Sequence, residues 1–249
     1  MNNINYSFLI SGLAGLATMI GTVIIFFRFK NTSKVIGVSL AFAVGVMITI
    51  CITDLIPSSY LTIKSRYEVI PAILIVSFFI IVGIIFSMFI NKFIPSDKNN
   101  NKLFRTGILS MITLMLHNIP EGIVTFITSN NDMKFGIILA IAISFHNIPE
   151  GISIAVPIYY STNSRIKALF YTFIAGVSEL LGAMVAYYFL LPLVSDYFFS
   201  ILYGIISGLM LYISINELLP TSTSYVNKKL IYLYMMFGSV LMFICHFML

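Results

Sequence analysis

Charged residues are scarce in this sequence, and tryptophan is absent. Only 9% of the 249 residues are charged and 59% are hydrophobic, with a mean hydropathy of +1.01. A soluble globular domain carries roughly 25% charged residues, so this composition excludes that class and indicates an integral membrane protein. The net charge of +5 is therefore no sign of nucleic-acid binding. What matters is where the basic residues lie along the chain.

Cysteine is also scarce. Cys51 and Cys245 both fall within apolar stretches, so the sequence does not indicate a disulfide framework, and we expect buried structural thiols. The first apolar run lacks a basic leader and a small-residue cleavage pattern. We expect it to be a retained span rather than a signal peptide.

Long apolar runs, by contrast, are abundant. They are continuous rather than alternating, which favours membrane-spanning helices over a β-barrel. The sequence predicts an all-α integral membrane protein with eight transmembrane helices in a single transmembrane domain, residues 1–249, with a short cytoplasmic loop at about 95–104. The eight expected spans are residues about 6–27, 35–56, 70–94, 105–128, 135–159, 166–190, 198–218 and 230–248.

The basic residues predict the orientation. Eleven of the fourteen lie in turns on one side of the bilayer, which marks that side as cytoplasmic. With an even number of spans, both termini are then expected outside a cell membrane. These eleven residues are Arg28, Lys30, Lys34, Lys92, Lys98, Lys102, Arg105, Arg165, Lys167, Lys228 and Lys229. The alternate turns hold Lys64, Arg66 and Lys134.

Two similar strings indicate internal symmetry. The second span ends in Asp54-Leu55-Ile56-Pro57, and the seventh ends in Glu217-Leu218-Leu219-Pro220. These spans cross the bilayer in opposite directions. Similar sequence with opposite topology is typical of an inverted repeat. We expect spans 1–3 and 6–8 to be repeats around antiparallel spans 4 and 5.

One hexapeptide occurs twice, near the middle of spans 4 and 5. The two copies are His117-Asn118-Ile119-Pro120-Glu121-Gly122 and His146-Asn147-Ile148-Pro149-Glu150-Gly151, and they contain two of the three histidines. On a helix, with His at zero, Asn lies at about 100° and Glu at about 40°. Each helix thus presents an imidazole, an amide and a carboxylate on one face.

Such a paired face suits a divalent metal such as zinc or ferrous iron, and carboxylates flanked by His and Asn could bridge two ions. A buried His–Glu pair could instead serve only to hold two helices together. Ionisable groups inside a membrane are functional by default, however, and this pair is duplicated. We therefore favour a metal site.

Further candidates lie outside the hexapeptides. Glu179, near the middle of span 6, has no basic residue at its depth and is a third expected ligand, although a protonated acid bonded to a hydroxyl would also explain it. Asp54 and Glu217, near opposite faces, are candidate entrance and exit acids. Met47 is a candidate soft ligand, with plain packing as the alternative. We do not expect His246 to be a core ligand.

These motifs resemble the ZIP (Zrt/Irt-like) family of metal-ion transporters, most closely its bacterial ZupT-like zinc transporter branch. The match rests on the doubled hexapeptide, on its continuation Ile152-Ser153-Ile154-Ala155-Val156-Pro157, and on Ser214-Ile215-Asn216-Glu217-Leu218-Leu219-Pro220. Leu180 departs from the proline common in that branch, and the His-rich cytoplasmic loop of many members is missing.

The resemblance implies eight helices with both termini outside and a binuclear centre between spans 4, 5 and 6. One site would use His117, Glu121, His146 and Glu150, with Met47 as a further candidate. The other would use Asn118, Glu121, Asn147, Glu150 and Glu179.

We therefore expect a membrane transporter, not an enzyme, that takes divalent metals into the cytoplasm. Zinc, ferrous iron, manganese, cobalt and cadmium all suit such ligands. No prosthetic group is expected, since the ions are bound in transit. The expected partners are the metal ions and the lipid bilayer, with a homodimer left open. A gated metal-selective channel is the main alternative, and an intramembrane metallohydrolase a less favoured one.

Overall fold

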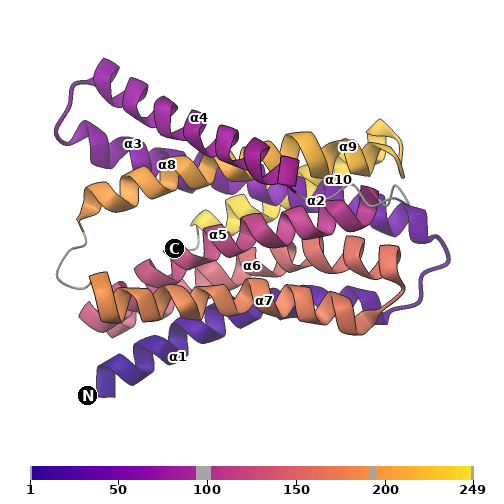
Figure 1. Ribbon diagram of the computed structural model, residues 1–249, viewed down its shortest axis with the longest axis horizontal. Coiled ribbons are helices and arrows are strands. Elements are labelled where there is room, and N and C mark those ends of the chain that lie inside the picture. Colours follow the sequence, from indigo (N-terminus) through magenta and orange to yellow (C-terminus); the bar gives the residue numbers. More distant parts are fainter. Residues whose placement is uncertain (1, 94–101, 191–194, 248–249) are drawn as a thin grey trace.

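Every regular element of the described residues is helical. The computed structural model of the chain describes residues 2–93, 102–190 and 195–247 (Figure 1). Eight helical stretches are long and apolar enough to cross a membrane, which confirms the expected all-α fold. Residues 95–101 of the expected loop lie outside the described residues.

In chain order the elements are α1 (Asn2–Leu16), η1 (Ala17–Phe26), α2 (Thr32–Ile50), η2 (Cys51–Leu55), α3 (Ile56–Lys64), α4 (Val69–Phe93), α5 (Lys102–Asn131), α6 (Met133–Thr162), α7 (Arg165–Val185), η3 (Ala186–Leu190), α8 (Asp196–Ile213), η4 (Ser214–Leu218), α9 (Leu219–Thr223) and α10 (Lys228–Phe247).

Spans 2 and 7 continue past the prolines that were expected to end them. Each contains one π-helical segment, η2 or η4, just before Pro57 or Pro220. The N–H before each proline bonds five residues back, from Ile56 to Cys51 and from Leu219 to Ser214. This wider turn accommodates the proline, which lacks an N–H of its own. The helices therefore run on through α3 and α9.

The spans form two bundles (Figure 1). In the motif bundle, made of α1, η1, α5, α6 and α7, the hexapeptide helices α5 and α6 pack on each other and on the helices of spans 1 and 6. In the flanking bundle, made of α2, η2, α3, α4, α8, η4, α9 and α10, α2 packs on α10 and α4 packs on α8. The two bundles meet where α2 contacts α6 and where α5 contacts α8.

The motif bundle has an internal two-fold relation that is visible residue by residue. A Cβ at Gly122 would lie 1.8 Å from the Glu179 carbonyl oxygen, and one at Gly151 would lie 1.9 Å from that of Thr18. The helices therefore touch backbone to backbone at equivalent places, as small residues permit in membranes. The reciprocal contacts match as well: Gly182 meets Ile119, and Gly21 meets Ile148.

The flanking bundle obeys the same relation. Ser59 Oγ donates to the Ser200 carbonyl at 2.8 Å, and Ser222 Oγ donates to the Gly37 carbonyl at 2.8 Å. The close backbone contacts pair likewise: Gly45 meets Met235 where Gly208 meets Ile80, and Gly238 meets Phe42 where Gly83 meets Ile205. These equivalences give the inverted repeat inferred from two short strings a structural basis along all eight spans.

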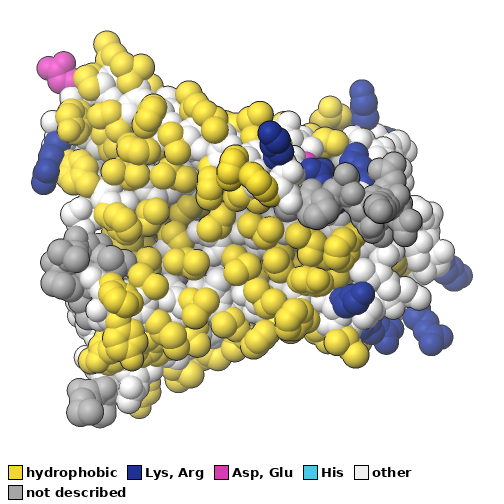
Figure 2. Space-filling view, in the orientation of Figure 1, with side chains coloured by type: hydrophobic (Ala, Val, Ile, Leu, Met, Phe, Trp, Pro, Cys, Tyr) yellow, Lys and Arg dark blue, Asp and Glu magenta, His cyan; other side chains and the backbone are white. Residues whose placement is uncertain are grey.

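The two ends of the molecule differ in charge. On the face shown in Figure 2, hydrophobic side chains cover the middle of the molecule, and most of the visible Lys and Arg side chains gather at one end. This basic end carries the turns at residues 27–31, 163–164 and 224–227. The N-terminus and the end of α10 lie at the opposite end (Figure 1). Both termini thus lie on the side away from the basic turns.

The close helix contacts predict a steric effect of small substitutions. Gly45→Ala would place a Cβ 2.0 Å from the Met235 carbonyl oxygen, whereas Gly12→Ala would meet only Leu180 Cδ1 at 3.7 Å. Overpacking of this kind costs about 1–3 kcal/mol. We expect Gly45→Ala to lower the thermal unfolding midpoint in detergent by several degrees and Gly12→Ala to leave it unchanged. Equal midpoints would contradict the contact.

Candidate metal centre

The two hexapeptides lie near the middle of α5 and α6, which both continue as helices through Pro120 and Pro149. Within each copy, His and Glu are four residues apart and so lie one above the other on the same helix face. All four of these side chains are buried, with the largest exposed fraction, 9%, at His146. The sequence expectation of one polar face per helix is met inside the motif bundle.

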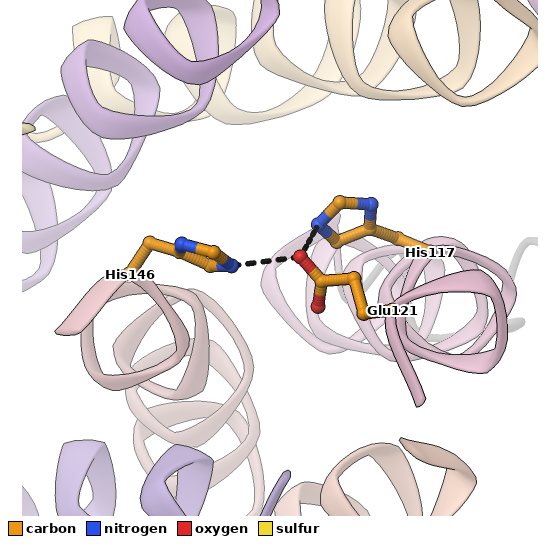
Figure 3. A group of neighbouring side chains, drawn as sticks. All are labelled: His117, Glu121 and His146. Atoms are coloured by element: carbon orange, nitrogen blue, oxygen red, sulfur yellow. Dashed lines mark hydrogen bonds and ion pairs between the residues drawn. The ribbon is translucent and has the colours of Figure 1, made fainter. Parts of the chain in front are cut away.

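Three of these groups converge on one point. The Glu121 carboxylate lies between the two imidazole rings (Figure 3), with its Oε1 2.7 Å from His146 Nε2 and 3.0 Å from His117 Nε2. The ligand atoms of His117, Glu121 and His146 all lie within 4.8 Å of one another. Two imidazole nitrogens and a carboxylate oxygen at this spacing form a set suited to zinc and similar cations.

Glu150 of the second hexapeptide also approaches His117. Its Oε1 is 3.7 Å from His117 Nε2, and the side chain is fully buried. Neither Glu150 oxygen has a hydrogen-bond partner among the described residues, and Glu121 Oε2 likewise has none. Buried carboxylates without partners are costly unless a cation compensates them. This pair of acids therefore favours a bound cation between the two helices.

The two asparagines are anchored in equivalent ways. Asn118 Nδ2 donates to the Ala175 carbonyl of α7 at 2.9 Å, and Asn147 Nδ2 donates to the Ala14 carbonyl of α1 at 3.0 Å. The amide nitrogens are thereby fixed, and both Oδ1 atoms are buried without a hydrogen-bond partner. An amide oxygen held in this manner is available as a neutral metal ligand.

Glu179 breaks the two-fold relation. Its repeat equivalent in η1 is Thr18, whose hydroxyl donates to the Gly15 carbonyl of α1 within the same span. Glu179 is fully buried, its Oε2 accepts from Asn147 Nδ2 at 3.1 Å, and its Oε1 has no hydrogen-bond partner. A third acid thus enters the polar region from one side only.

A cavity of about 220 Å³ leads to this cluster from the end opposite the basic turns. Its wall includes Glu121 and His146 from the motif bundle and Asp54 and Ser58 from the flanking bundle. A second cavity of about 600 Å³, nearer the surface, shares Val124 and Tyr203 with it and is lined by Ser65. The two cavities adjoin each other between the bundles, and the inner one reaches the Glu121 and His146 side chains.

Repeat-equivalent residues differ in exposure. Glu121 is 8% exposed and its equivalent Glu150 is not exposed at all, whereas His146 is 9% exposed and His117 is 1% exposed. The same holds along the cavity wall, where Ala142 and Ile143 correspond to the more deeply buried Thr113 and Leu114. The structure is therefore open toward one end and closed toward the basic end.

The remaining predicted residues are placed as follows. Met47 is fully buried in α2 within the main hydrophobic core. Asp54 lines the cavity, in keeping with an entrance. Glu217 is 6% exposed, and Asn91 Nδ2 donates to its Oε1 at 2.9 Å. The two cysteines are free thiols, as expected; Cys51 is buried and Cys245 is partly buried.

Sequence reasoning missed the residues around Glu217 and the cavity wall. Arg105 entered only as one of the basic residues that set orientation, and Asn91 and Tyr203 were not considered. Asn91 carried a weak signal, because it is an uncharged polar residue that lies next to Lys92 at the end of a long apolar helix. Tyr203 carried none, since a tyrosine in an apolar span is ordinary.

The fold and the site together define a helical membrane protein of the metal-ion transporter class. The family model described as ZIP zinc transporter matches residues 98–246. The zinc transporter ZupT of Clostridium perfringens is 36% identical over 273 aligned positions, covering 97% of this chain and 95% of that protein.

Two further relatives agree. The zinc transporter ZupT of Streptococcus mutans is 35% identical, with 88% of each chain covered. That of Oceanobacillus iheyensis is 37% identical, with 90% of this chain and 91% of the relative covered. The chain belongs to the ZIP family and is a membrane transporter rather than an enzyme.

The geometry predicts how Glu121 contributes to metal binding. Loss of a group that merely supports a ligand costs about 10–100-fold in metal affinity, so loss of the shared ligand Glu121 should cost at least about 100-fold. We expect Glu121→Gln to weaken zinc binding to that extent in competition with a fluorescent chelator in detergent. Glu68→Gln, at an exposed acid, is the matched control and should bind as the unaltered chain does. Equal affinities in the two variants would rule out Glu121 as a ligand.

Proposed function

We propose that the protein is a carrier that moves zinc into the cytoplasm through the centre between α5 and α6. The observation that carries this proposal is the convergence of Glu121 with His117 and His146, buried between two hexapeptide helices and reached from one end by a cavity. A site that only joined helices would need no such access. The relatives named above are zinc transporters by name, which favours zinc as the main substrate.

The proposed centre holds two ions. His117, His146, Glu121 and Glu150 would bind the first, with Met47 as a further candidate ligand. Glu121 and Glu150 would bridge to the second. Support comes from the buried oxygens that lack hydrogen-bond partners, which are more numerous than one ion of low coordination number needs. The second ion would use Asn118, Asn147 and Glu179 as well as the bridging acids.

The proposed direction of uptake follows from charge and access. Basic turns mark the cytoplasmic side of a membrane protein, so the cavity opens to the outside and both termini lie outside the cell membrane. An ion would enter past Asp54 and leave past Glu217. Because a cavity lies between the two bundles at one end and polar contacts join them at the other, we propose alternating access by movement of one bundle against the other.

Selectivity among first-row metals is proposed to be moderate. Imidazole and carboxylate ligands accept ferrous iron, manganese and cobalt as well as zinc, and cadmium also suits such a site. A homodimer stays a prediction, to be tested by the mass of the protein–detergent complex.

Uptake into proteoliposomes tests the ligands. We expect His117→Ala combined with Glu150→Ala to abolish uptake of radioactive zinc, because a ligand of each hexapeptide is lost. Lys64→Ala combined with Glu68→Ala changes two exposed residues and should leave uptake unchanged. Undiminished uptake in the first double variant would mean that the ion crosses elsewhere.

A gated channel with the same site is the second candidate function, and counterflow separates it from a carrier. Because the basic end is closed while the opposite end is open, the site is accessible from only one side of the membrane at a time. We therefore expect unlabelled zinc inside the liposomes to speed entry of external radioactive zinc. In a channel, internal zinc would only reduce net entry, and that result would favour the channel.

A further inference from the structure

A polar network joins the two bundles at the basic end. Asn91 of α4 donates through Nδ2 to Glu217 Oε1 at 2.9 Å and to the Tyr212 hydroxyl at 2.8 Å. Arg105 of α5 donates to the Asn91 carbonyl at 2.8 Å and also to the Asn91 side-chain oxygen. Arg105 Nη1 lies 3.8 Å from Glu217 Oε1. The asparagine thus bridges a guanidinium and a buried carboxylate.

These contacts cross the boundary between the bundles. Asn91, Tyr212 and Glu217 belong to the flanking bundle, whereas Arg105 belongs to the motif bundle. A further contact between the bundles lies beside them: the Thr106 hydroxyl of α5 and the Thr221 hydroxyl of α9 are 3.1 Å apart. Movement of one bundle against the other at this end must break the contacts of Arg105 with Asn91 and Glu217 and the contact between Thr106 and Thr221.

Behind the network, hydroxyl side chains lead along α5 toward the metal centre. Thr106, Ser110, Thr113 and His117 recur at helical spacing and share one helix face. The Ser110 and Thr113 hydroxyls are buried without a hydrogen-bond partner among the described residues. Buried hydroxyls normally have partners, protein or water. Their isolation here is explained if this seam between the bundles is wetted in another conformation.

The repeat relation identifies this seam as the closed counterpart of the open cavity. Glu217 corresponds to Asp54, which lines that cavity. Thr113 corresponds to Ala142, which lines it as well. Positions that face a cavity at one end are therefore buried behind Arg105 and Asn91 at the other.

We propose that Arg105, Asn91 and Glu217 form a latch that holds the basic end of the metal path closed, and that the Thr113–Ser110–Thr106 face of α5 is the exit route. The inference rests on the proposed uptake function. While the latch is closed, the Arg105 guanidinium lies beside the Glu217 carboxylate, which a departing cation would otherwise contact. Opening it frees Glu217 and lets water reach the hydroxyls.

Thiol accessibility tests the latch without measuring transport. Thr113→Cys is introduced into a Cys51→Ala, Cys245→Ala background that retains zinc uptake, in vesicles whose basic end faces the bulk solution. Labelling by a membrane-impermeant maleimide is normalised to Ser224→Cys, an exposed position in the turn at that end. Loss of the latch should raise the population of the open state and hence the labelling rate. We expect an increase of at least about tenfold for Arg105→Gln and for Asn91→Ala, because each removes a bond between the bundles.

Arg165→Gln is the matched control. Arg165 lies at the same end, but its guanidinium stacks on Phe26 at 5.1 Å, within the motif bundle. It should leave Thr113→Cys labelling unchanged. No increase in either latch variant, or an equal increase in Arg165→Gln, would overturn the proposal. Asn91→Ala keeps the charges of Arg105 and Glu217. It therefore tests whether the latch holds the basic end closed even if Arg105→Gln does not fold.

The two proposals fail separately. If Glu121→Gln abolishes zinc uptake while both latch variants label at the original rate, the transport site stands and the latch is wrong. If Thr113→Cys is labelled faster in the latch variants but zinc uptake survives loss of the proposed ligands, the latch is supported. The proposal that zinc crosses through these ligands is then wrong.

Discussion

The structure depends on two carboxylates that are buried at its centre, far from any lysine or arginine of the described residues that could pair with them. Glu121 and Glu150 lie at the centre of a protein whose surface is suited to hydrocarbon, with oxygens that lack hydrogen-bond partners. A buried ion without compensation costs several kcal/mol. A divalent cation removes much of that cost, so occupancy of the site and stability of the motif bundle should be linked. The same requirement explains the fixed asparagines and the close glycine contacts, which hold the ligands around a space of defined size.

The inverted repeat accounts for this arrangement of ligands and supports. Two antiparallel copies of one ligand helix place two imidazoles and two carboxylates at one depth, and the same relation supplies their supports in spans 1 and 6. Departures from the symmetry are then informative. Glu179 against Thr18 adds an acid on one side. Arg105, Asn91 and Glu217 close one end, while the equivalent region around Asp54 is open.

Much of this could be predicted from the sequence, and the limits have physical causes. The eight spans follow from apolar length, and the hexapeptide cluster follows from polar groups that hydrocarbon does not tolerate without a purpose. The continuations beyond Pro57 and Pro220 did not follow, because a π-helical turn that accommodates proline leaves no compositional sign. The network around Glu217 was missed because Arg105 resembles any other basic residue at a membrane face. Its role depends on Asn91, brought to it by a different helix.

The residue-by-residue equivalence of the repeats has one more consequence. If the two halves exchanged conformations, the basic end would open along Thr113 and Leu114, and the opposite end would close by bringing Lys134, the equivalent of Arg105, toward Asp54. The exchange would thus give a second end state built from the same set of equivalent contacts. Some equivalent residues differ chemically, such as Glu179 and Thr18, so the two states would differ in free energy. That difference would set the resting conformation of the empty protein, while the ion gradients would set the net direction of transport.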